Sequence, residues 1–101
     1  MKRIYISGPM SNIPEFNFPA FYSEAKYLRD QGCDVVNPAE MDIGDPSTLI
    51  WHECLRRDII ELMSCDSIWM LPGWSESKGA QLEHHIAYEL GMNIIYPRNW
   101  L

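Results

Sequence analysis

Apolar residues along this chain follow two alternating spacings. Short runs rich in β-branched and aromatic residues predict strands, and apolar residues three and four positions apart predict helices with one buried face. The predicted strands cover residues 3–7, 34–36, 67–71 and 93–96. The predicted helices run from about Asn17 to Gly32, from Ser47 or Thr48 to about Met63, and from about Lys78 to Leu90. Strand and helix are therefore expected to alternate throughout.

Turn-forming residues mark the ends of these elements. Asn17 is expected to cap the first helix, with Pro19 in its first turn, where a missing N–H costs little. Gly32 and Gly91 are expected to end the first and third helices, and residues 39–47 are expected to form a loop. The residues expected on buried helix faces are Phe21, Ala25 and Leu28; Ile50, Cys54, Leu55, Ile59, Leu62 and Met63; and Ala80, Ile86, Ala87 and Leu90.

The alternation predicts an α/β fold in a single domain over residues 1–101. We expect a flavodoxin- or Rossmann-like three-layer sandwich with a parallel sheet of four to five strands. The expected strand order 2-1-3-4 places the topological switch point between the first and third strands, where ligands bind at the carboxyl ends. Residues 7–10 and 72–74 follow those two strands. The two glycine-containing loops are therefore expected to meet at one crevice.

The segment 75–83 carries the strongest candidate chemistry. Polar and small residues follow a predicted buried strand and open a helix, and Glu83 falls on the second turn of that helix. Backbone N–H groups at such a turn can hold an anion, and a carboxylate beside it is a candidate nucleophile or general base. The helix dipole alone also favours a glutamate early in a helix, so a purely structural role stays open.

Composition narrows the classes of ligand. The formal net charge of -6 over 101 residues argues against nucleic-acid polymers and anionic membranes as partners. A small anionic ligand stays compatible, because a local pocket can oppose the net charge.

No apolar run approaches the roughly 20 residues of a membrane span, and we expect no signal peptide because the N-terminus leads directly into a strand. Cys33, Cys54 and Cys65 lack metal-ligand spacing, so we expect reduced thiols, a cytoplasmic location, no metal and no other cofactor.

Four motifs occur together in one order. They are Ile4-Tyr5-Ile6-Ser7-Gly8-Pro9, Leu55-Arg56-Arg57-Asp58-Ile59, Cys65-Asp66-Ser67-Ile68 and Gly79-Ala80-Gln81-Leu82-Glu83. This ordered set resembles the nucleoside 2-deoxyribosyltransferase superfamily over nearly the whole chain. The superfamily includes the 2'-deoxynucleoside 5'-phosphate N-hydrolases and a branch of small bacterial and phage proteins that is similar overall. The resemblance implies cleavage or transfer at an N-glycosidic bond.

The resemblance also implies roles for individual residues. Glu83 matches the nucleophile that attacks C1' of the sugar, Tyr5 a tyrosine that orients it, and Asp58 an aspartate implicated in proton transfer. Gly79 matches a glycine that lets the backbone approach the sugar or phosphate. Ser77 matches the serine of the phosphate-specific hydrolases, which implies a 5'-monophosphate ligand, with Ser11 and Lys78 as additional candidate phosphate contacts. The implied substrate-binding residues are Gly8, Pro9, Met10, Ser11, Trp74, Ser77 and Gly79.

Simpler roles compete with these assignments. Asp58 is also typical of a solvated helix residue, and Tyr5 lies between Ile4 and Ile6, where it can serve only in packing. Trp74, in the crevice loop, is a candidate both for packing and for stacking on a base. His84 and His85 are neighbours on a helix and point about 100° apart, so they are expected at the surface or in an interface.

Three functional hypotheses stay open. The leading one is cleavage or transfer of the sugar of a deoxynucleoside monophosphate, which differ only in whether water or an acceptor base takes the sugar. The second is a non-catalytic nucleotide-binding module or sensor, and the third is cleavage of another N-riboside such as NAD. We expect a homodimer or larger homo-oligomer, because a domain of this size leaves its crevice open to a neighbouring subunit.

Overall fold

The centre of the molecule is a sheet of four parallel strands. The structure is a computed structural model that describes residues 2–41 and 50–97. Its strands are β1 (Arg3–Ser7), β2 (Asp34–Val36), β3 (Ser67–Met70) and β4 (Asn93–Ile95). Their order is β2-β1-β3-β4. The predicted order is confirmed, and the switch point lies between β1 and β3.

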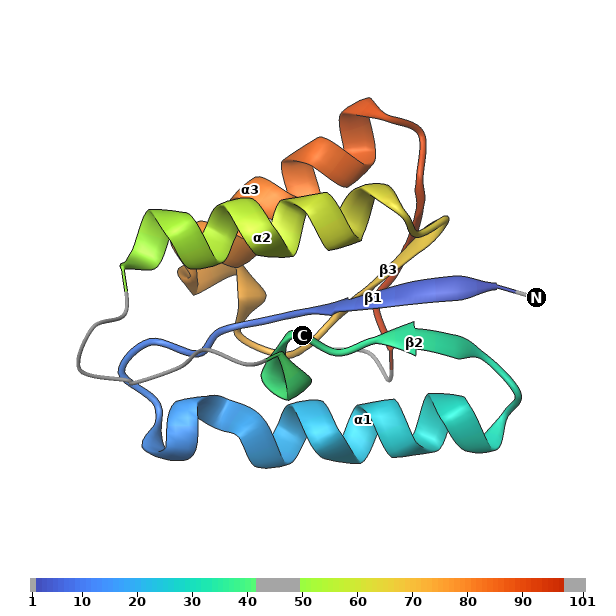
Figure 1. The fold of residues 1–101 in the computed structure, drawn as a ribbon, viewed down its shortest axis with the longest axis horizontal. Helices are drawn as coiled ribbons and strands as arrows, with labels where there is room; N and C mark the ends of the chain where they lie inside the picture. The colour runs from blue at the N-terminus through green and yellow to red at the C-terminus, as the bar shows by residue number, and fades with distance from the viewer. Residues whose placement is uncertain (1, 42–49, 98–101) are drawn as a thin grey trace.

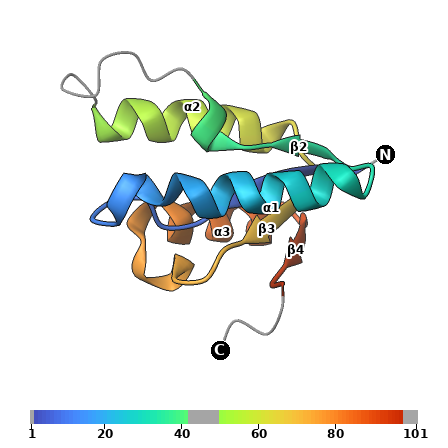
Figure 2. The ribbon, with the colours of Figure 1, turned by 90° about the horizontal axis from the view of Figure 1, so that it is seen from below.

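Three helices cover the two faces of this sheet. Helix α1 (Phe18–Asp30) lies on one face, and α2 (Trp51–Met63) and α3 (Lys78–Glu89) lie on the other (Figures 1 and 2). The arrangement confirms the predicted three-layer α/β sandwich of the flavodoxin or Rossmann type. None of the helices in residues 2–41 and 50–97 is long and apolar enough to cross a membrane.

Strand β1 separates two hydrophobic clusters. Successive side chains of a strand point to opposite faces, so Ile4 and Ile6 pack toward α1, whereas Tyr5 packs on the side of α2 and α3. The cluster on the α1 side is formed by Ile4, Ile6, Phe21, Ala25, Leu28, Val35, Ala39 and Leu71. The other cluster is formed by Tyr5, Val36, Leu62, Ile68, Met70 and Ala87. The side chain at position 7 therefore points to the same face as Tyr5.

The start of α1 differs from the prediction. Asn17 occupies the cap position but has a left-handed backbone (φ 61°), and its side chain makes no capping hydrogen bond. Its Nδ2 instead donates to the carbonyl oxygen of Pro9 at 2.9 Å, because the left-handed turn directs the amide to the loop after β1. Within the described residues, short 3₁₀ segments also lie between the longer elements: η1 (Pro14–Asn17), η2 (Pro38–Glu40) and η4 (Trp74–Glu76).

Three residues predicted to face inward are exposed. The exposed fractions are 45% for Ile50, 47% for Met63 and 60% for Leu90. A helix of 13 residues spans about 20 Å, whereas a strand of three residues spans about 10 Å. The helix ends therefore extend beyond the sheet that covers their middle turns. Helix α2 begins at Trp51, and the expected cap at Ser47 or Thr48 lies outside the described residues.

Candidate active site

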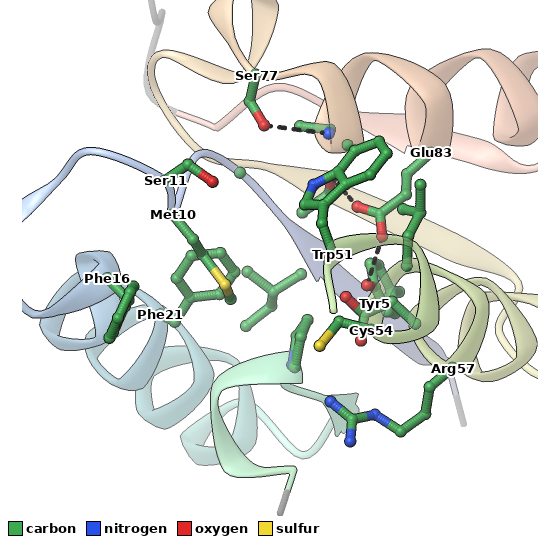
Figure 3. A pocket seen from close by; sticks show the side chains of 18 of the residues that line it. Tyr5, Met10, Ser11, Phe16, Phe21, Trp51, Cys54, Arg57, Ser77 and Glu83 are labelled. Carbon is green, nitrogen blue, oxygen red and sulfur yellow. Dashed lines mark hydrogen bonds between the residues drawn. The ribbon is translucent and has the colours of Figure 1, made fainter. Parts of the chain in front are cut away.

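Two hydroxyl groups of β1 hold the carboxylate of Glu83. The Tyr5 hydroxyl donates to Glu83 Oε2 and the Ser7 hydroxyl to Glu83 Oε1, each over 2.7 Å. Tyr5 and Ser7 are two residues apart on one strand and therefore share a face, while Glu83 reaches them from the second turn of α3. Figure 3 shows the Tyr5 hydroxyl and the Glu83 carboxylate pointing at each other. Strand periodicity thus explains why one carboxylate receives two hydroxyl donors.

Burial changes the protonation of this group. Glu83 is only 5% exposed, and burial raises the pKa of its carboxyl to about 7. The hydrogen bonds from Ser7 and Tyr5 oppose this rise in pKa, and the negative charge of Asp58 adds to it. Burial also raises the pKa of Tyr5 well above its usual value, so the phenol stays protonated and remains a donor. Glu83 is therefore able to change its charge near neutral pH.

Asp58 brings a second carboxyl group to the same place. It lies on α2 and lines the same pocket as Glu83. Burial raises the pKa of Asp58 to about 6, and the nearby charge of Arg57 partly opposes that rise. Two carboxyl groups that both ionise late hold one proton between them near neutrality. Such a pair offers one carboxylate and one carboxylic acid at the same time.

The carboxyl pair lines a cavity of about 290 Å³ at the carboxyl end of β1. Its walls come from β1 and the loop after it, from η1 and α1, and from α2 and α3. In Figure 3, Met10, Phe16 and Phe21 lie on one side of the pocket and Glu83 and Tyr5 on the other. The apolar and aromatic part of the lining includes Met10, Phe16, Phe18, Phe21, Trp51 and Leu55. The pocket therefore has a carboxyl end and an aromatic end.

Most of the predicted site residues meet in this pocket. Those that line it are Tyr5, Gly8, Met10, Ser11, Asp58, Ser77, Gly79 and Glu83. Pro9 and Trp74 do not line it. The carbonyl oxygen of Pro9 accepts the Asn17 amide, and its ring packs close to Gly73. Pro9 therefore acts in the packing of the loops rather than in the cavity wall.

Trp74 belongs to an aromatic cluster outside the pocket. Its ring stacks on His84, with ring centroids 4.2 Å apart and an interplanar angle of 17°. The His84 ring in turn hydrogen-bonds through Nε2 to the hydroxyl of Tyr96. The three side chains connect η4, α3 and the residue after β4. The structure thus favours the packing role of Trp74 over the stacking role.

The start of α3 is organised by Ser77. Its Oγ accepts a hydrogen bond from the backbone N–H of Ala80 at 3.3 Å, which is the bond expected of a helix cap. The same hydroxyl retains its proton to donate into the pocket that it lines. Lys78 is exposed and does not line the pocket. Ser77 rather than Lys78 is therefore placed to meet a ligand at this end of α3.

The two glycines that line the pocket, Gly8 and Gly79, differ in whether a larger side chain would fit. A Cβ added to Gly8 would lie 2.7 Å from Cβ of Leu71, which is a clash with the residue that follows β3. A Cβ added to Gly79 would meet only Leu55, at 3.8 Å, which is ordinary contact. Packing of the protein therefore demands a glycine at position 8 and not at position 79.

Several residues of the pocket were not predicted as site residues, among them Ser7, Phe16, Trp51 and Arg57. A signal existed for Ser7, because it follows Tyr5 by two positions in a predicted strand. Arg57 lies within the motif Leu55-Arg56-Arg57-Asp58-Ile59, where no role was assigned to it, and no pattern marked Phe16 or Trp51. Phe16 has a left-handed backbone (φ 54°) and Trp51 is 53% exposed, and neither feature has a periodic signature in the sequence. Phe16 thus reaches the pocket from an irregular turn, whereas Trp51 reaches it from the first residue of α2.

Within residues 2–41 and 50–97, no group of three or more His, Cys, Asp or Glu side chains is arranged to hold a metal ion.

Comparisons with known proteins bear on the fold and the family. The family model described as "Domain of unknown function (DUF4406)" matches residues 2–96. No curated protein matches the chain. Among solved structures, the chain is similar to a conserved protein from Enterococcus faecalis V583, with a TM-score of 0.67 and 23% sequence identity. The match covers 93% of this chain and 61% of that one, and at this identity it supports the fold alone.

Proposed function

This chain belongs to the family described as DUF4406, and we propose that it cleaves the N-glycosidic bond of a deoxynucleoside 5'-monophosphate, releasing or transferring the sugar. The observation that carries the proposal is the buried carboxylate of Glu83, which is held by two hydroxyl groups and shares a cavity with Asp58. Departure of a base from C1' develops positive charge on the sugar. A fixed carboxylate beside a second, protonated carboxyl group suits that reaction.

In the first step, a carboxylate oxygen of Glu83 forms a bond to C1' while the bond from C1' to the base nitrogen breaks. The electron pair of that bond leaves with the base, and the carboxylic acid of Asp58 supplies a proton to it. The hydroxyl donors of Tyr5 and Ser7 favour the ionised form of Glu83. The pKa values of about 7 for Glu83 and about 6 for Asp58 place the shared proton on Glu83 in the free protein. The two hydroxyl donors thereby lower the cost of moving that proton to Asp58, which is the arrangement that reacts.

In the second step, water or an acceptor base attacks C1' and breaks the bond to Glu83. The carboxylate of Asp58, now without its proton, accepts the proton that the attacking group loses. With water the product is the free sugar phosphate, and with a base it is a new nucleotide. Both carboxyl groups return to their starting charge, so the cycle balances without a cofactor.

The two ends of the pocket suggest how the ligand lies. Phe16 lies at the apolar end of the cavity, and the ring of Trp51 also lines it (Figure 3); aromatic rings stack favourably on nucleobases. The hydroxyls of Ser11 and Ser77 line the cavity on one side and the cation of Arg57 on the opposite side (Figure 3), and such groups bind phosphate. The base would therefore occupy the aromatic end and C1' would lie beside Glu83.

Release of free base from each of the four deoxynucleoside monophosphates tests the proposal. Wild-type protein is compared with Glu83→Ala, and Glu24→Ala serves as a control that removes a buried glutamate outside the pocket. Release by wild type and the control, but not by Glu83→Ala, supports the proposal. Ribonucleotides and NAD are included in the panel. Release only from these would support an N-riboside hydrolase, and nucleotide binding without any release would support a non-catalytic module.

We also propose that the protein forms a homo-oligomer. Large apolar side chains are exposed on the layer of α2 and α3, at Ile60 (69%), Tyr88 (68%) and Leu90 (60%), and exposed apolar patches are typical of subunit interfaces. Light scattering at micromolar concentration tests the assembly, and a purely monomeric protein would contradict it.

We also propose a reducing compartment such as the cytoplasm, because the three cysteines are unpaired thiols.

A further inference from the structure

We propose that Ser7 is a positioning residue for Glu83: its hydroxyl fixes Oε1 so that the carboxylate meets the sugar in one orientation. This inference rests on the proposed function, in which Glu83 attacks C1'. It assigns a role to a residue that the family resemblance does not mark.

The geometry separates Ser7 from Tyr5. The two hydroxyls bind different oxygens of one carboxylate, each over 2.7 Å. With one donor alone, the carboxylate can pivot about the hydrogen-bonded oxygen, and its second oxygen changes position. With donors on both oxygens, this pivoting breaks one of the two hydrogen bonds. Ser7 therefore supplies the second of two fixed points.

The backbone that carries Ser7 is rigid. Ser7 is 1% exposed and pairs with Met70 across the sheet, and its carbonyl oxygen accepts the N–H of Leu71 at 2.8 Å. The next residue, Gly8, packs closely against Leu71. A hydroxyl on such a backbone has little freedom beyond rotation of its own side chain. The position of Glu83 Oε1 is therefore set by the centre of the sheet.

The same hydrogen bond controls charge. A donor to a carboxylate favours its ionised form, and the Ser7 hydroxyl accordingly lowers the pKa of Glu83 against the effect of burial. Removing the hydroxyl leaves Oε1 buried with one donor fewer, so Glu83 would ionise at higher pH. A purely structural serine would change stability but would leave the titration of Glu83 in place.

The test compares Ser7→Ala with Ser67→Ala. Ser67 is also 1% exposed in a neighbouring strand, and its hydroxyl also donates over 2.7 Å to a carboxylate, that of Asp66, but it does not line the pocket. The titration of the Glu83 side-chain carboxyl is followed by NMR in each protein. The pH profile of kcat/KM for base release is measured beside it, and thermal unfolding verifies the fold.

We expect Ser7→Ala to raise the titration midpoint of Glu83 by roughly half to one pH unit, as the loss of one hydrogen bond implies. The value of kcat/KM should fall about tenfold near pH 6 and recover part of this loss at higher pH. Ser67→Ala should leave both curves in place. An unchanged midpoint in Ser7→Ala, or an equal shift in Ser67→Ala, would overturn the role of Ser7. Absence of turnover in wild type would instead contradict the proposed function, and the NMR midpoint would still show whether Ser7 acts on Glu83.

Discussion

Two buried glutamates lie on opposite faces of the same sheet. Glu83 on α3 is 5% exposed and Glu24 on α1 is 4% exposed, so burial alone does not distinguish them. Their surroundings do. Glu24 accepts a hydrogen bond from the indole N–H of Trp69 at 3.3 Å and does not line the pocket. Glu83 meets two hydroxyls, a second carboxyl group and a cavity.

The difference shows what turns a buried carboxylate into a candidate site. A glutamate packed within a layer can serve the fold by receiving a hydrogen bond from a neighbour. A glutamate that faces a cavity keeps lone pairs for a ligand while its other contacts fix its direction. The chemistry proposed for Glu83 therefore depends on the cavity and on Asp58 as much as on Glu83 itself.

The largest expected effect is on turnover. Glu83→Gln keeps the size of the side chain but removes the nucleophilic oxygen pair, so base release should fall by at least about 10³-fold. Steady-state assays of base release measure this change. Glu24→Gln is the matched control and should stay within about twofold of wild type. A loss of similar size in both variants would erase the proposed distinction between the two glutamates.

The second effect concerns Asp58. Asp58→Asn cannot supply a proton to the leaving base, and the rate should fall by about 10²-fold to 10³-fold. Wild type should show a bell-shaped pH profile with its maximum near the values of about 6 and about 7 that belong to the carboxyl pair. Asp58→Asn should lose the decline on the alkaline side. A profile of unchanged shape would show that another group supplies the proton.

The third effect is on stability. The folded-state pKa of Glu83 is raised from 4.5 to about 7, so the folded protein holds this proton more tightly than the unfolded chain does. The free energy of unfolding should therefore decrease as pH rises from about 4.5 to about 7 and then level off. Glu83→Gln lacks this decrease and should be more stable than wild type at pH 8 by up to about 3 kcal/mol. Urea unfolding at pH 5 and pH 8 measures the difference, and equal stabilities at pH 8 would contradict it.

The smallest expected effect is on nucleotide binding, and it compares a tryptophan in the pocket with one outside it. Trp51 lines the pocket, whereas Trp74 stacks on His84 outside it. Loss of stacking on a base costs about 1–3 kcal/mol, so Trp51→Leu should weaken deoxynucleotide binding about tenfold. Trp74→Leu should change binding less than about twofold. Calorimetric titration with a deoxynucleoside monophosphate separates the two, and the reverse result would restore the base-stacking role of Trp74.

The regular part of the molecule was predictable from sequence. Strand and helix periodicities predicted the elements that carry Tyr5 and Glu83, and their alternation predicted a parallel sheet. The strand order 2-1-3-4 was an additional assumption, and it placed the ends of the first and third strands together. Packing and base stacking were both predicted as candidate roles of Trp74, and the sequence did not choose between them. Its partners His84 and Tyr96 come from other elements, and their stacking depends on side-chain orientation. Phe16 escaped prediction for a related reason: its left-handed backbone lies in an irregular turn. Hydrophobic patterns predict which faces of helices and strands are buried, and they carry no information on the backbone of irregular loops.

The most direct test of Glu83 as a nucleophile is detection of the covalent intermediate. The protein is mixed with a deoxynucleoside monophosphate, quenched rapidly, digested and analysed by peptide mass spectrometry. We predict a deoxyribose phosphate adduct on the peptide that contains Glu83, formed by wild type and Glu24→Gln and absent from Glu83→Gln. Base release with an adduct on a different residue, or undiminished base release by Glu83→Gln, would contradict the central role of Glu83.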